Sequence, residues 1–396
     1  MLSSLKVTYH FSCLKPVLVL EENEYSDFIH LILPDLFKNR RGYYMYKIAV
    51  VPGDGIGKEV VKEGMRVLDA VSKRFGFSLE WRTFPWGCDY YIANGKMMPS
   101  DGLEQLKQYD AIFLGAVGTP GVPDHVSLWG LLIPIRREFR QYVNVRPVRL
   151  LRGITSPLRS KTAGDIDFYV VRENNEGEYS NIGGRIYTGT EEEITVQESV
   201  FTRKGVERIQ RFGYELAKKL NRKHLTSATK SNGIVFTMPF WDEIFAELSS
   251  AYPDVETDQF HIDALCAKVV LDPGYFDVIV ASNLFGDIIS DLGPAVAGSL
   301  GIAASGNLNP EREFPSMFEP VHGSAPDIAG KGIANPIGQI WSGALMLEHL
   351  GEPAAARVIE GAIETALDDR NMKTPDLGGT ATTEELGKTI ADIVAG

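Results

Sequence analysis

The segment NLFGDIISDLGP, residues 283–294, sets the architecture of this chain. It follows residues 276–281, Phe-Asp-Val-Ile-Val-Ala, an apolar run rich in β-branched side chains that predicts a buried strand. We expect the chain to turn at Gly286 and to enter a helix, from which Ile288 and Ile289 point into the core. A buried strand followed by a helix is the repeating unit of an α/β fold.

Asp287 and Asp291 are the chemically informative residues of this segment. They are four residues apart, so they share one face of the predicted helix. They also follow the carboxyl end of a buried strand, where open α/β sheets place their ligands. A hard divalent cation with oxygen ligands, Mg²⁺ or Mn²⁺, relieves the repulsion between two such carboxylates. The alternative is an exposed helix start whose acids suit the helix dipole.

Composition excludes several classes of protein. The 396 residues, 44% of them hydrophobic, suffice for two lobes of one large α/β architecture. The net charge is −12 and no basic patch stands out, so nucleic acid is not an expected partner. Three widely spaced cysteines, Cys13, Cys88 and Cys266, suit a reducing compartment and a cytoplasmic location. No apolar run approaches ~18 residues, so we expect no membrane span.

Residues 1–44 differ from the rest of the chain. Their two apolar runs, at 17–20 and 29–33, are too short to span a bilayer. Their acidic residues argue against a transit peptide, and no cleavage pattern indicates a signal peptide. Met45 then opens a sequence that looks like a natural start. We interpret residues 1–44 as a non-catalytic N-terminal extension of unknown role.

Strands and helices alternate through the remainder. The predicted elements are strands at 47–51, 111–117 and 168–171, helices at 58–75 and 203–220, and an extended arm at 190–201. Such alternation indicates a mostly parallel sheet with helices on its faces.

A glycine-rich loop, PGDGIG at 52–57, joins the first predicted strand to its helix. Gly53 and Gly55 fit the Rossmann fingerprint, but Lys58 occupies the place of its third glycine. The loop therefore does not identify a standard Rossmann site. Its glycines indicate that something approaches the backbone closely at this point.

Three arginines, Arg136, Arg146 and Arg172, lie near the ends of predicted strands or helices; we call them the arginine triad. Guanidinium groups bind carboxylates through two parallel hydrogen bonds, so three of them suggest a substrate with more than one carboxylate. The alternative for each is ion pairing at the surface. That alternative fits Arg172 least, because this residue closes an apolar strand.

Tyr179 and Lys230 are candidates for proton transfer. A lysine close to a bound cation and to arginines can act as a base, and a tyrosine can donate a proton. Asp263 is a further candidate metal ligand. The alternatives are a packed aromatic ring, a solvated lysine and an exposed acid.

Residues 319–330, EPVHGSAPDIAG, are small, polar and glycine-rich, as a segment that wraps a nucleotide would be. Asp327 can accept hydrogen bonds from both hydroxyls of an unmodified ribose, but it would repel a 2′-phosphate. If a dinucleotide binds here, NAD is favoured over NADP.

Three motifs in combination resemble the β-decarboxylating 2-hydroxyacid dehydrogenases, the family of the isocitrate and isopropylmalate dehydrogenases. They are GDGIG at 53–57, NLFGDIISD at 283–291 and EPVHGSAPD at 319–327. The resemblance implies an α/β fold of two lobes, not a standard Rossmann fold, with the active site in the cleft between them. The implied lobes are a nucleotide-binding lobe of residues 45–141 plus 299–396 and a dimerisation and catalytic lobe of residues 142–298.

The resemblance also implies roles for matching residues. It implies a homodimer with shared active sites, in which Asp287 and Asp291 of one subunit and Asp263 of its partner bind the metal. Lys230, also from the partner, is the implied base that takes the hydroxyl proton, and Tyr179 the implied acid that protonates the enol. The arginine triad looks like the substrate-carboxylate clamp. The implied NAD contacts are Ile56, Glu319, His322, Gly323, Ser324, Ala325, Asp327 and Asn335. The implied cofactors are NAD and Mg²⁺ or Mn²⁺, with a need for K⁺ left open.

Substrate preference is indicated by the segment SLWGLLIPIR at 127–136. Leu132 and Ile133 stand in the region where isocitrate enzymes hold an extra carboxylate with polar residues, so isocitrate is disfavoured. An apolar patch suits the isopropyl group of 3-isopropylmalate, which stays the alternative.

Other motifs resemble the tartrate and D-malate branch of the family. They are PWGCDYY at 85–91, LWG at 128–130 and EGEYS at 176–180. This resemblance implies NAD-dependent oxidative decarboxylation of D-malate to pyruvate and CO₂, or oxidation of tartrate. A non-catalytic, ligand-binding subunit is an alternative of another class, which the presence of both Tyr179 and Lys230 disfavours.

Overall fold

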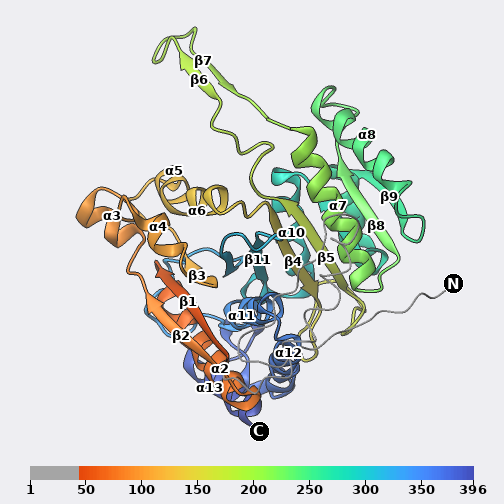
Figure 1. The fold of residues 1–396 in the computed structure, drawn as a ribbon. Helices are drawn as coiled ribbons and strands as arrows, with labels where there is room; N and C mark the ends of the chain where they lie inside the picture. Colours follow the sequence, from red (N-terminus) through yellow and green to blue (C-terminus); the bar gives the residue numbers. More distant parts are fainter. Residues whose placement is uncertain (1–43) are drawn as a thin grey trace, which may run out of the picture. The chain divides into compact units, whose positions relative to one another are not determined.

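Ten strands form one sheet in the part of the chain that the computed structural model describes, residues 44–396 (Figure 1). The extension predicted at residues 1–44 lies outside the described residues except for Tyr44, where the first strand begins. The strands follow one another across the sheet in the order β2 (Phe77–Thr83), β1 (Tyr44–Gly53), β3 (Ala111–Ala116), β12 (Ser316–Pro320), β11 (Ala304–Leu308), β4 (Val143–Arg149), β5 (Asp167–Glu173), β10 (Val278–Ala281), β8 (His224–Thr229) and β9 (Glu256–His261).

Neighbouring strands are parallel toward both edges of the sheet and antiparallel in its middle. β2, β1, β3 and β12 are parallel to one another, and so are β5, β10, β8 and β9. β11 is antiparallel to both β12 and β4, and β4 is antiparallel to β5. The predicted fold class is confirmed, and three antiparallel pairs join two blocks of parallel strands. The lobe boundaries stay a prediction.

Strands β1, β3 and β10 have both faces covered, which explains their apolar sequences, whereas the edge strands β2 and β9 are partly exposed. In β1, Ile48 and Val50 enter one hydrophobic core while Ala49 and Val51 enter another. The four residues of β10 alternate between two cores in the same way. The strands predicted from apolar runs are therefore present, with ends that differ by one or two residues in most cases.

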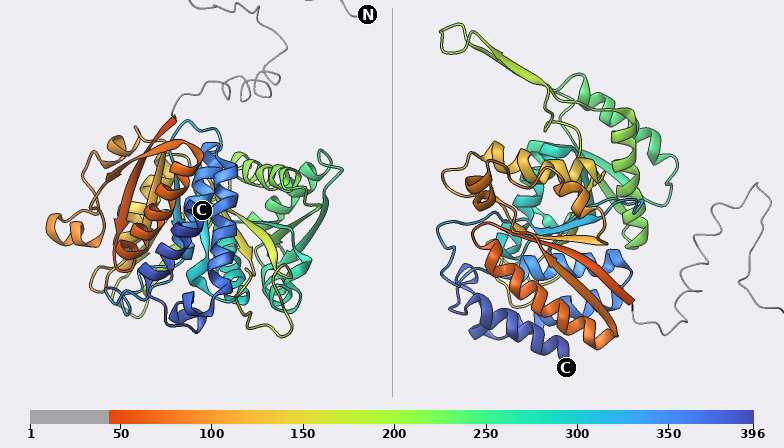
Figure 2. Two further views of the ribbon diagram at one scale, coloured as in Figure 1. Left: turned by 90° about the horizontal axis from the view of Figure 1, so that it is seen from below. Right: turned by 60° about the vertical axis from the view of Figure 1, so that its left-hand side comes forward.

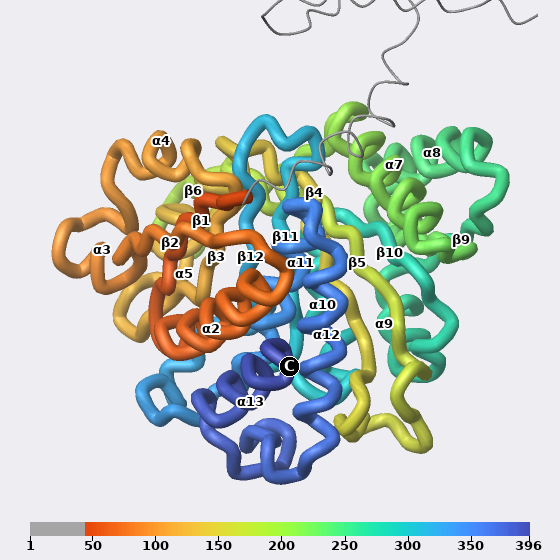
Figure 3. The backbone as a smooth tube through the Cα atoms, turned by 60° about the horizontal axis from the view of Figure 1, so that its bottom comes forward, coloured from red at the N-terminus to blue at the C-terminus, as the bar shows by residue number. Residues whose placement is uncertain are grey.

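Helices cover both faces of this sheet. The longer ones are α2 (Gly57–Phe75), α7 (Arg203–Lys219), α8 (Thr237–Ser249), α9 (Ile262–Leu271), α10 (Asn283–Ala297), α11 (Ile337–Leu350), α12 (Pro353–Asp368) and α13 (Thr383–Ala395). The shorter ones are α3 (Cys88–Asn94), α4 (Gly102–Leu106), α5 (Asp124–Ser127), the π-helical turn η1 (Leu128–Leu132), α6 (Ile133–Glu138) and 3₁₀ turns at Pro273–Tyr275, Leu300–Ile302, Arg370–Met372 and Pro375–Leu377. α2 packs against α11 and α13, and α12 also packs against α11 and α13 (Figure 3).

Local sequence sets the ends of the helices. α2 ends at Gly76, whose φ of 78° is left-handed, a conformation that glycine adopts without strain. α7 begins after Thr202, whose Oγ1 accepts a hydrogen bond from the Gly205 N–H at 3.0 Å. Both helices match their predicted ranges within one residue. No helix within residues 44–396 combines the length and the apolar character needed to cross a membrane.

Two expectations for the 283–294 segment are wrong. α10 begins at Asn283, so Gly286 lies inside its first turn and not at a bend before it. A Cβ on Gly286 would lie 2.6 Å from the Cβ of Arg172, so this glycine allows a close approach. Ile289 is buried as expected, but Ile288 is 44% exposed. Successive residues of a helix turn by about 100°, so only Ile289 lies opposite the Asp287 face.

The predicted extended arm is a two-stranded hairpin that projects from the sheet (Figures 1 and 2). β6 (Gly183–Ile186) pairs antiparallel with β7 (Ile194–Gln197), so the arm begins earlier than predicted. Every residue of both strands is exposed, including the apolar Ile186, Ile194 and Val196. Exposed apolar side chains on a projecting arm mark a surface that is suited to contact another protein chain.

Candidate active site

A cavity of about 160 Å³ lies at the start of α10, and we call it the arginine cavity. Its walls are Leu128, Ile133, Arg136, Arg137, Arg146, Arg172, Asn174, Tyr179, Asn283 and Asp287. The whole arginine triad lines it, together with Tyr179 and Asp287. The residues come from η1 and α6, from β4, from β5 and the loop after it, and from α10. Tertiary structure thus gathers these five candidate residues together with Ile133 of the predicted apolar patch.

Arg146 and Arg172 reach the cavity from neighbouring antiparallel strands. Arg172 lies opposite Asn144, two residues from Arg146, so all three side chains project from one face of the sheet. Both arginines are buried, with 6% and 3% exposed, and burial lowers the pKa of both guanidinium groups. Arg172 Nε and Nη2 donate to Asn283 Oδ1 at 3.1 and 2.7 Å, and Arg146 Nη1 donates to Ser290 Oγ at 2.6 Å. Such partners are what a buried charge requires.

Arg136 enters from α6 and is paired with an acid. Its Nη2 donates to Glu319 Oε1 at 2.8 Å, and both side chains are largely buried. Arg136 Nε is also buried and has no hydrogen-bond partner among residues 44–396. A buried donor without an acceptor is costly, which fits a site whose acceptor arrives with a ligand. Glu319, predicted to contact NAD, therefore faces the arginine triad.

Asp287 lies between two guanidinium groups. Its Oδ1 pairs with Arg172 Nη1 and lies 3.4 Å from Arg146 Nη1. Burial by itself raises the pKa of this carboxyl, but the two arginines and a hydrogen bond from Tyr179 outweigh burial and hold the pKa below its usual value. Asp287 is therefore ionised at neutral pH.

Asp291 is the more exposed carboxylate of the pair. Its Oδ1 lies 3.5 Å from Arg146 Nη1. Partial burial raises the pKa of Asp291, Arg146 opposes this effect, and the negative charge of Asp287 adds to it. Asp287 and Asp291 thus offer carboxylate oxygens from one helix, as predicted.

The Tyr179 hydroxyl points at the same carboxylate. It donates to Asp287 Oδ2 at 3.0 Å, and the Arg172 guanidinium lies 5.5 Å from the centre of its ring. Burial raises the pKa of Tyr179, and the charge of Asp287 adds to the rise while Arg172 opposes it. The phenol consequently keeps its proton at neutral pH, as a proton donor must.

Lys230 and Asp263 do not line the arginine cavity of their own chain. They pair with each other, with Lys230 Nζ 2.5 Å from Asp263 Oδ1, just after β8 and at the start of α9. This hydrogen bond is the main reason why the pKa of Asp263 is lowered. Within residues 44–396 no three carboxylate, imidazole or thiol groups lie close enough together to hold a metal ion. Asp263 thus lies apart from Asp287 and Asp291 in one chain.

A π-helical turn shapes the apolar wall of the cavity. The Ile133 N–H reaches the Leu128 carbonyl five residues earlier, and Pro134, which has no N–H to donate, follows directly. Leu128 and Ile133 therefore line the cavity side by side, while Leu132 packs against a hydrophobic core. The predicted apolar patch exists, but Leu128 takes the place expected for Leu132.

Sequence reasoning missed Arg137 and Asn174. The Arg137 guanidinium lies 4.9 Å from the centre of the Trp129 ring, and its Nη2 donates to the Tyr179 carbonyl at 2.8 Å. It therefore ties the η1 turn to the loop that carries Tyr179. The sequence offered one sign of a role for Arg137: it directly follows the candidate Arg136, beside the apolar segment at 127–135.

The glycine-rich loop at 52–57 lies against the segment predicted to wrap NAD. The Ile56 N–H donates to the Ser324 carbonyl at 2.9 Å, and a Cβ on Gly55 would lie 2.1 Å from that oxygen. The close approach expected at these glycines is therefore made by the chain's own backbone. Asp54 is buried and accepts hydrogen bonds from the Cys88 and Gly118 N–H groups, so it holds loops together.

The predicted NAD contacts are distributed around these two loops. Gly323 and Asp327 are exposed, whereas Ile56 packs against Ala325 in a small apolar cluster. His322 is half-buried, and burial lowers the pKa of its imidazole, so the ring is neutral near pH 7. Asn335 is buried and donates to Asp376 Oδ2 at 3.0 Å. Their contacts with NAD stay predictions.

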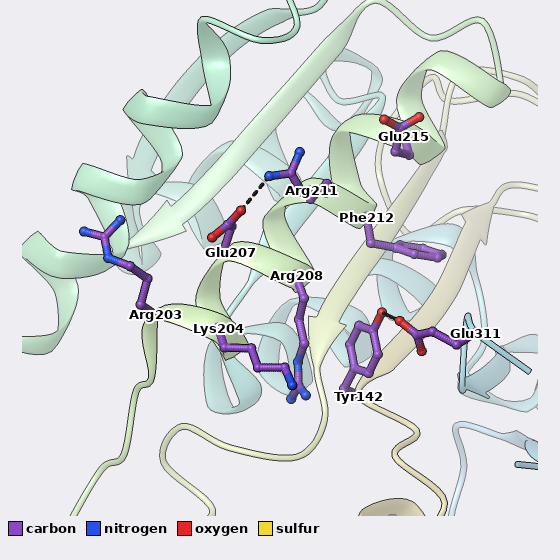
Figure 4. A pocket seen from close by; sticks show the side chains of 9 residues that line it. All are labelled: Tyr142, Arg203, Lys204, Glu207, Arg208, Arg211, Phe212, Glu215 and Glu311. Carbon is purple, nitrogen blue, oxygen red and sulfur yellow. Dashed lines mark hydrogen bonds and ion pairs between the residues drawn. The ribbon is translucent and has the colours of Figure 1, made fainter. Parts of the chain in front are cut away.

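A larger cavity of about 570 Å³ lies along α7, next to Tyr142 and Glu311 (Figure 4). Its charges are mostly paired within the protein. Arg211 pairs with Glu207, Arg208 with the buried Glu173, and the Tyr142 hydroxyl donates to Glu311 at 2.7 Å. None of the predicted site residues lines it.

Comparison with known proteins places this architecture. The sequence profile of the isocitrate/isopropylmalate dehydrogenases matches residues 47–390, and the chain therefore belongs to the isocitrate/isopropylmalate dehydrogenase family. The structure resembles the crystal structure of isocitrate dehydrogenase from Methylococcus capsulatus, with a TM-score of 0.81 and 36% identity over 89% of this chain and 100% of that chain.

Within the family, the chain is most informatively compared with two enzymes. The tartrate dehydrogenase/decarboxylase of Pseudomonas putida is 58% identical over 360 residues, which cover 89% of this chain and 98% of that protein. The D-malate dehydrogenase [decarboxylating] of Escherichia coli (strain K12) is 58% identical over 355 residues, 88% of this chain and 98% of that protein. The predicted family and the predicted likeness to its tartrate and D-malate branch are both confirmed.

Proposed function

We propose that this protein is a decarboxylating dehydrogenase that converts D-malate to pyruvate and CO₂ and also acts on tartrate, with NAD and a divalent metal ion. The observation that carries the proposal is the arginine cavity, where three guanidinium groups, the Tyr179 hydroxyl and the Asp287 carboxylate meet in about 160 Å³. Relatives that are 58% identical over nearly their whole length bear the names of decarboxylating dehydrogenases of these two substrates.

The arginine triad binds the two carboxylates of the substrate. Charge-assisted pairs between guanidinium and carboxylate are strong and directional, and here they form in a largely buried site. Leu128 and Ile133 face the third carbon of the substrate from the apolar wall. A small cavity with this wall favours a C4 dicarboxylate over the larger isocitrate.

Two protons move during the reaction. Lys230 of a second copy takes the proton of the C2 hydroxyl, and Tyr179 delivers a proton to the carbon that loses CO₂. When bound, NAD⁺ would supply the hydride acceptor, and Mg²⁺ or Mn²⁺ would polarise the substrate oxygen. The balanced outcome is pyruvate, CO₂ and NADH from D-malate and NAD⁺. The raised pKa of Tyr179 supports its role as the acid.

The donor set fits a hard cation. Asp287 and Asp291 present carboxylate oxygens on one face of α10, and Asp263 of a second copy completes the set. The loops around Ile56 and Asp327 would hold NAD, and the exposed Asp327 is free to meet a ribose. A need for K⁺ stays an open part of this proposal.

The active unit in this proposal is a homodimer with shared sites. Large apolar side chains are exposed six residues after Lys230 and at the far end of the helix that begins beside Asp263: Phe236 is 86% exposed and Leu271 81%. Pairing of two copies would cover such exposed apolar side chains, as it would those of the arm. The cysteine content supports a cytoplasmic location for this dimer.

NADH formation in the presence of Mn²⁺ tests the proposal. The specificity constant kcat/KM is compared for D-malate, L-tartrate, 3-isopropylmalate and isocitrate, and D-malate or tartrate should lead. A lead for 3-isopropylmalate would contradict the proposed substrate. A protein that binds Mn²⁺ and malate but never reduces NAD⁺ would establish the non-catalytic alternative.

Tyr179→Phe tests the assigned acid. It should lower kcat with D-malate by about 10²–10⁴-fold. Tyr275→Phe is the matched control, because its hydroxyl also donates to an aspartate, Asp258 Oδ2 at 2.6 Å, but does so outside the cavity. Equal kcat values for the two variants would show that Tyr179 is not the acid of the reaction.

A further inference from the structure

A row of polar side chains crosses the middle of the sheet. Asn307 of β11 lies opposite Asn144 of β4, which in turn lies opposite Arg172 of β5. Residues that face each other in antiparallel strands project from the same side of a sheet. Asn307 and Asn144 have no exposed surface, and Arg172 has 3%. A buried polar row in the centre of a sheet is costly unless every group is paired.

The Asn307 amide uses its full hydrogen-bonding capacity. Its Oδ1 accepts from Asn144 Nδ2 at 3.0 Å and from Asn174 Nδ2 at 2.9 Å. Its Nδ2 donates to Glu319 Oε1 at 2.8 Å and to the Met317 carbonyl at 3.3 Å. Two acceptor sites and two donors are all that an amide offers, so the side chain has a single favourable orientation.

Two members of the arginine triad are attached to this amide through one intermediary each. Glu319 Oε1, which accepts from Asn307, also accepts from Arg136 Nη2 at 2.8 Å. Asn144, which donates to Asn307, accepts from Arg146 Nε at 2.8 Å. Arg136 comes from α6 and Arg146 from β4, on opposite sides of the boundary predicted between the lobes. Asn307 is therefore hydrogen-bonded to a partner of each arginine, to Glu319 and to Asn144.

We propose that Asn307 is a positioning residue that fixes the spacing between Arg136 and Arg146, and so selects a substrate whose two carboxylates are separated as in a C4 dicarboxylate. The inference rests on the proposed function, because it assumes that these arginines hold opposite carboxylates. A rotated or shortened side chain at 307 would leave Glu319 and Asn144 without a common partner. Asn144 would keep its bond to Ser305 Oγ at 2.7 Å and Arg146 its bond to Ser290 Oγ, but the chain of hydrogen bonds that joins Arg146 to Arg136 through Asn307 would be broken.

The neighbouring Asn309 supplies a matched control. It is equally buried, and its Nδ2 donates to the Arg140 carbonyl and to Glu311 Oε2, both at 3.3 Å. Its Oδ1 accepts from the Phe314 N–H at 3.1 Å. None of these partners is an arginine of the triad, Glu319 or Asn144. A substitution at Asn309 therefore reproduces the loss of a buried amide without disturbing the clamp.

Asn307→Asp and Asn309→Asp are the variants to compare. Both exchange an amide for a carboxyl group of nearly the same size. Only Asn307→Asp removes the donor to Glu319 and sets a second acid beside it. Inhibition constants are measured against D-malate for succinate, a C4 dicarboxylate, and for butyrate, a C4 monocarboxylate. Butyrate needs one guanidinium, whereas succinate needs two at a set distance.

In Asn307→Asp the inhibition constant for succinate should rise about ten-fold or more while that for butyrate changes little. KM for D-malate should rise with a smaller change in kcat. Asn309→Asp should keep the preference of the wild type for succinate. An unchanged preference in Asn307→Asp would overturn the inference. If Asn307→Asp does not fold, Asn307→Ser, which also loses the bonds to Glu319 and Asn144, must weaken the preference for succinate, and an unchanged preference there would equally overturn the inference.

Failure of the proposed function gives a different result. A wild-type protein that shows no preference for succinate over butyrate does not hold two carboxylates at all, whatever Asn307 does. A wild type with a strong preference that Asn307→Asp retains leaves the proposed function intact and removes only the positioning role.

Discussion

Gly286→Ala is expected to damage both stability and substrate binding, although alanine is the better helix former. Gly286 lies in the first turn of α10, where a Cβ would be 2.6 Å from both Cβ and Cγ of Arg172 and 3.1 Å from its Cα. Cβ and Cα belong to the rigid part of β5, so they cannot rotate away. Either α10 moves outward with Asp287, or Arg172 is displaced from the cavity.

The magnitude follows from two opposing effects. Exchange of glycine for alanine inside a helix stabilises the fold by about 1 kcal/mol. Overpacking a rigid, buried contact costs about 1–3 kcal/mol, and the backbone position of the clash favours the upper end. The net change is a loss of about 2 kcal/mol in the free energy of unfolding. Because the clash is with Arg172, KM for D-malate should also rise.

Gly361→Ala in α12 isolates the helix-forming effect. Gly361 is exposed, and no atom lies within 4 Å of the Cβ it would gain. This variant should therefore have a higher Tm than the wild type and an unchanged KM. The assay is thermal unfolding at one fixed scan rate, followed by NADH formation with D-malate. If Gly286→Ala melts at or above the wild-type Tm and keeps its KM, the close packing of α10 on Arg172 has no energetic importance.

Three further predictions address the shared site, the NAD loops and pH. Coexpression of Tyr179→Phe with Lys230→Met should restore about a quarter of wild-type turnover. About half of randomly formed dimers contain one subunit of each kind, and one of the two sites in such a dimer is intact. No recovery would mean that both residues act within one subunit. Gly55→Ala should raise KM for NAD and lower Tm, since its φ is 51° and its Cβ would lie 2.1 Å from the Ser324 carbonyl oxygen. Gly351→Ala at the end of α11 should lower only Tm, because its φ is 98° but no atom lies within 4 Å of the added Cβ. Burial raises the pKa of Glu173 from 4.5 to about 7, with Arg208 opposing it. Between about pH 4.5 and 7 the folded protein therefore keeps a proton on Glu173 that the unfolded chain has released. The free energy of unfolding should consequently fall as the pH rises through this range. In denaturant titrations at pH 5 and 8, Glu173→Gln should reduce the difference in the free energy of unfolding between the two pH values. An unchanged difference would mean that another group causes the pH dependence.

The strands and helices that the sequence predicted correctly are those whose signal is local. β1, β3 and β10 are buried on both faces and so carry unbroken apolar runs, and α2 and α7 carry helical periodicity with a cap at one end. The family motifs are local as well, since a glycine loop, a pair of acids and a polar loop are each contiguous in the chain. These features sufficed for the fold class, the family and its branch.

Expectations failed where the answer depended on a distant neighbour. Gly286 looked like a turn residue because nothing in its own segment shows that Arg172 packs against it. Leu132 looked like a wall of the cavity because the sequence does not show the π-helical turn that brings Leu128 beside Ile133. The pairing of Glu319 with Arg136 was likewise not foreseen, because it joins residues 183 positions apart, and the predicted contact of Glu319 with NAD stays a prediction.

The order of residues along the chain sets which side chains are available for chemistry: three arginines, a tyrosine and two acids four residues apart. How these side chains are held depends on the pairing of strands that are distant in the chain. The row from Arg172 through Asn144 to Asn307 exists because β5, β4 and β11 are antiparallel neighbours in one register. Strand order and register are set by the burial of whole faces across the sheet, and no local pattern encodes them.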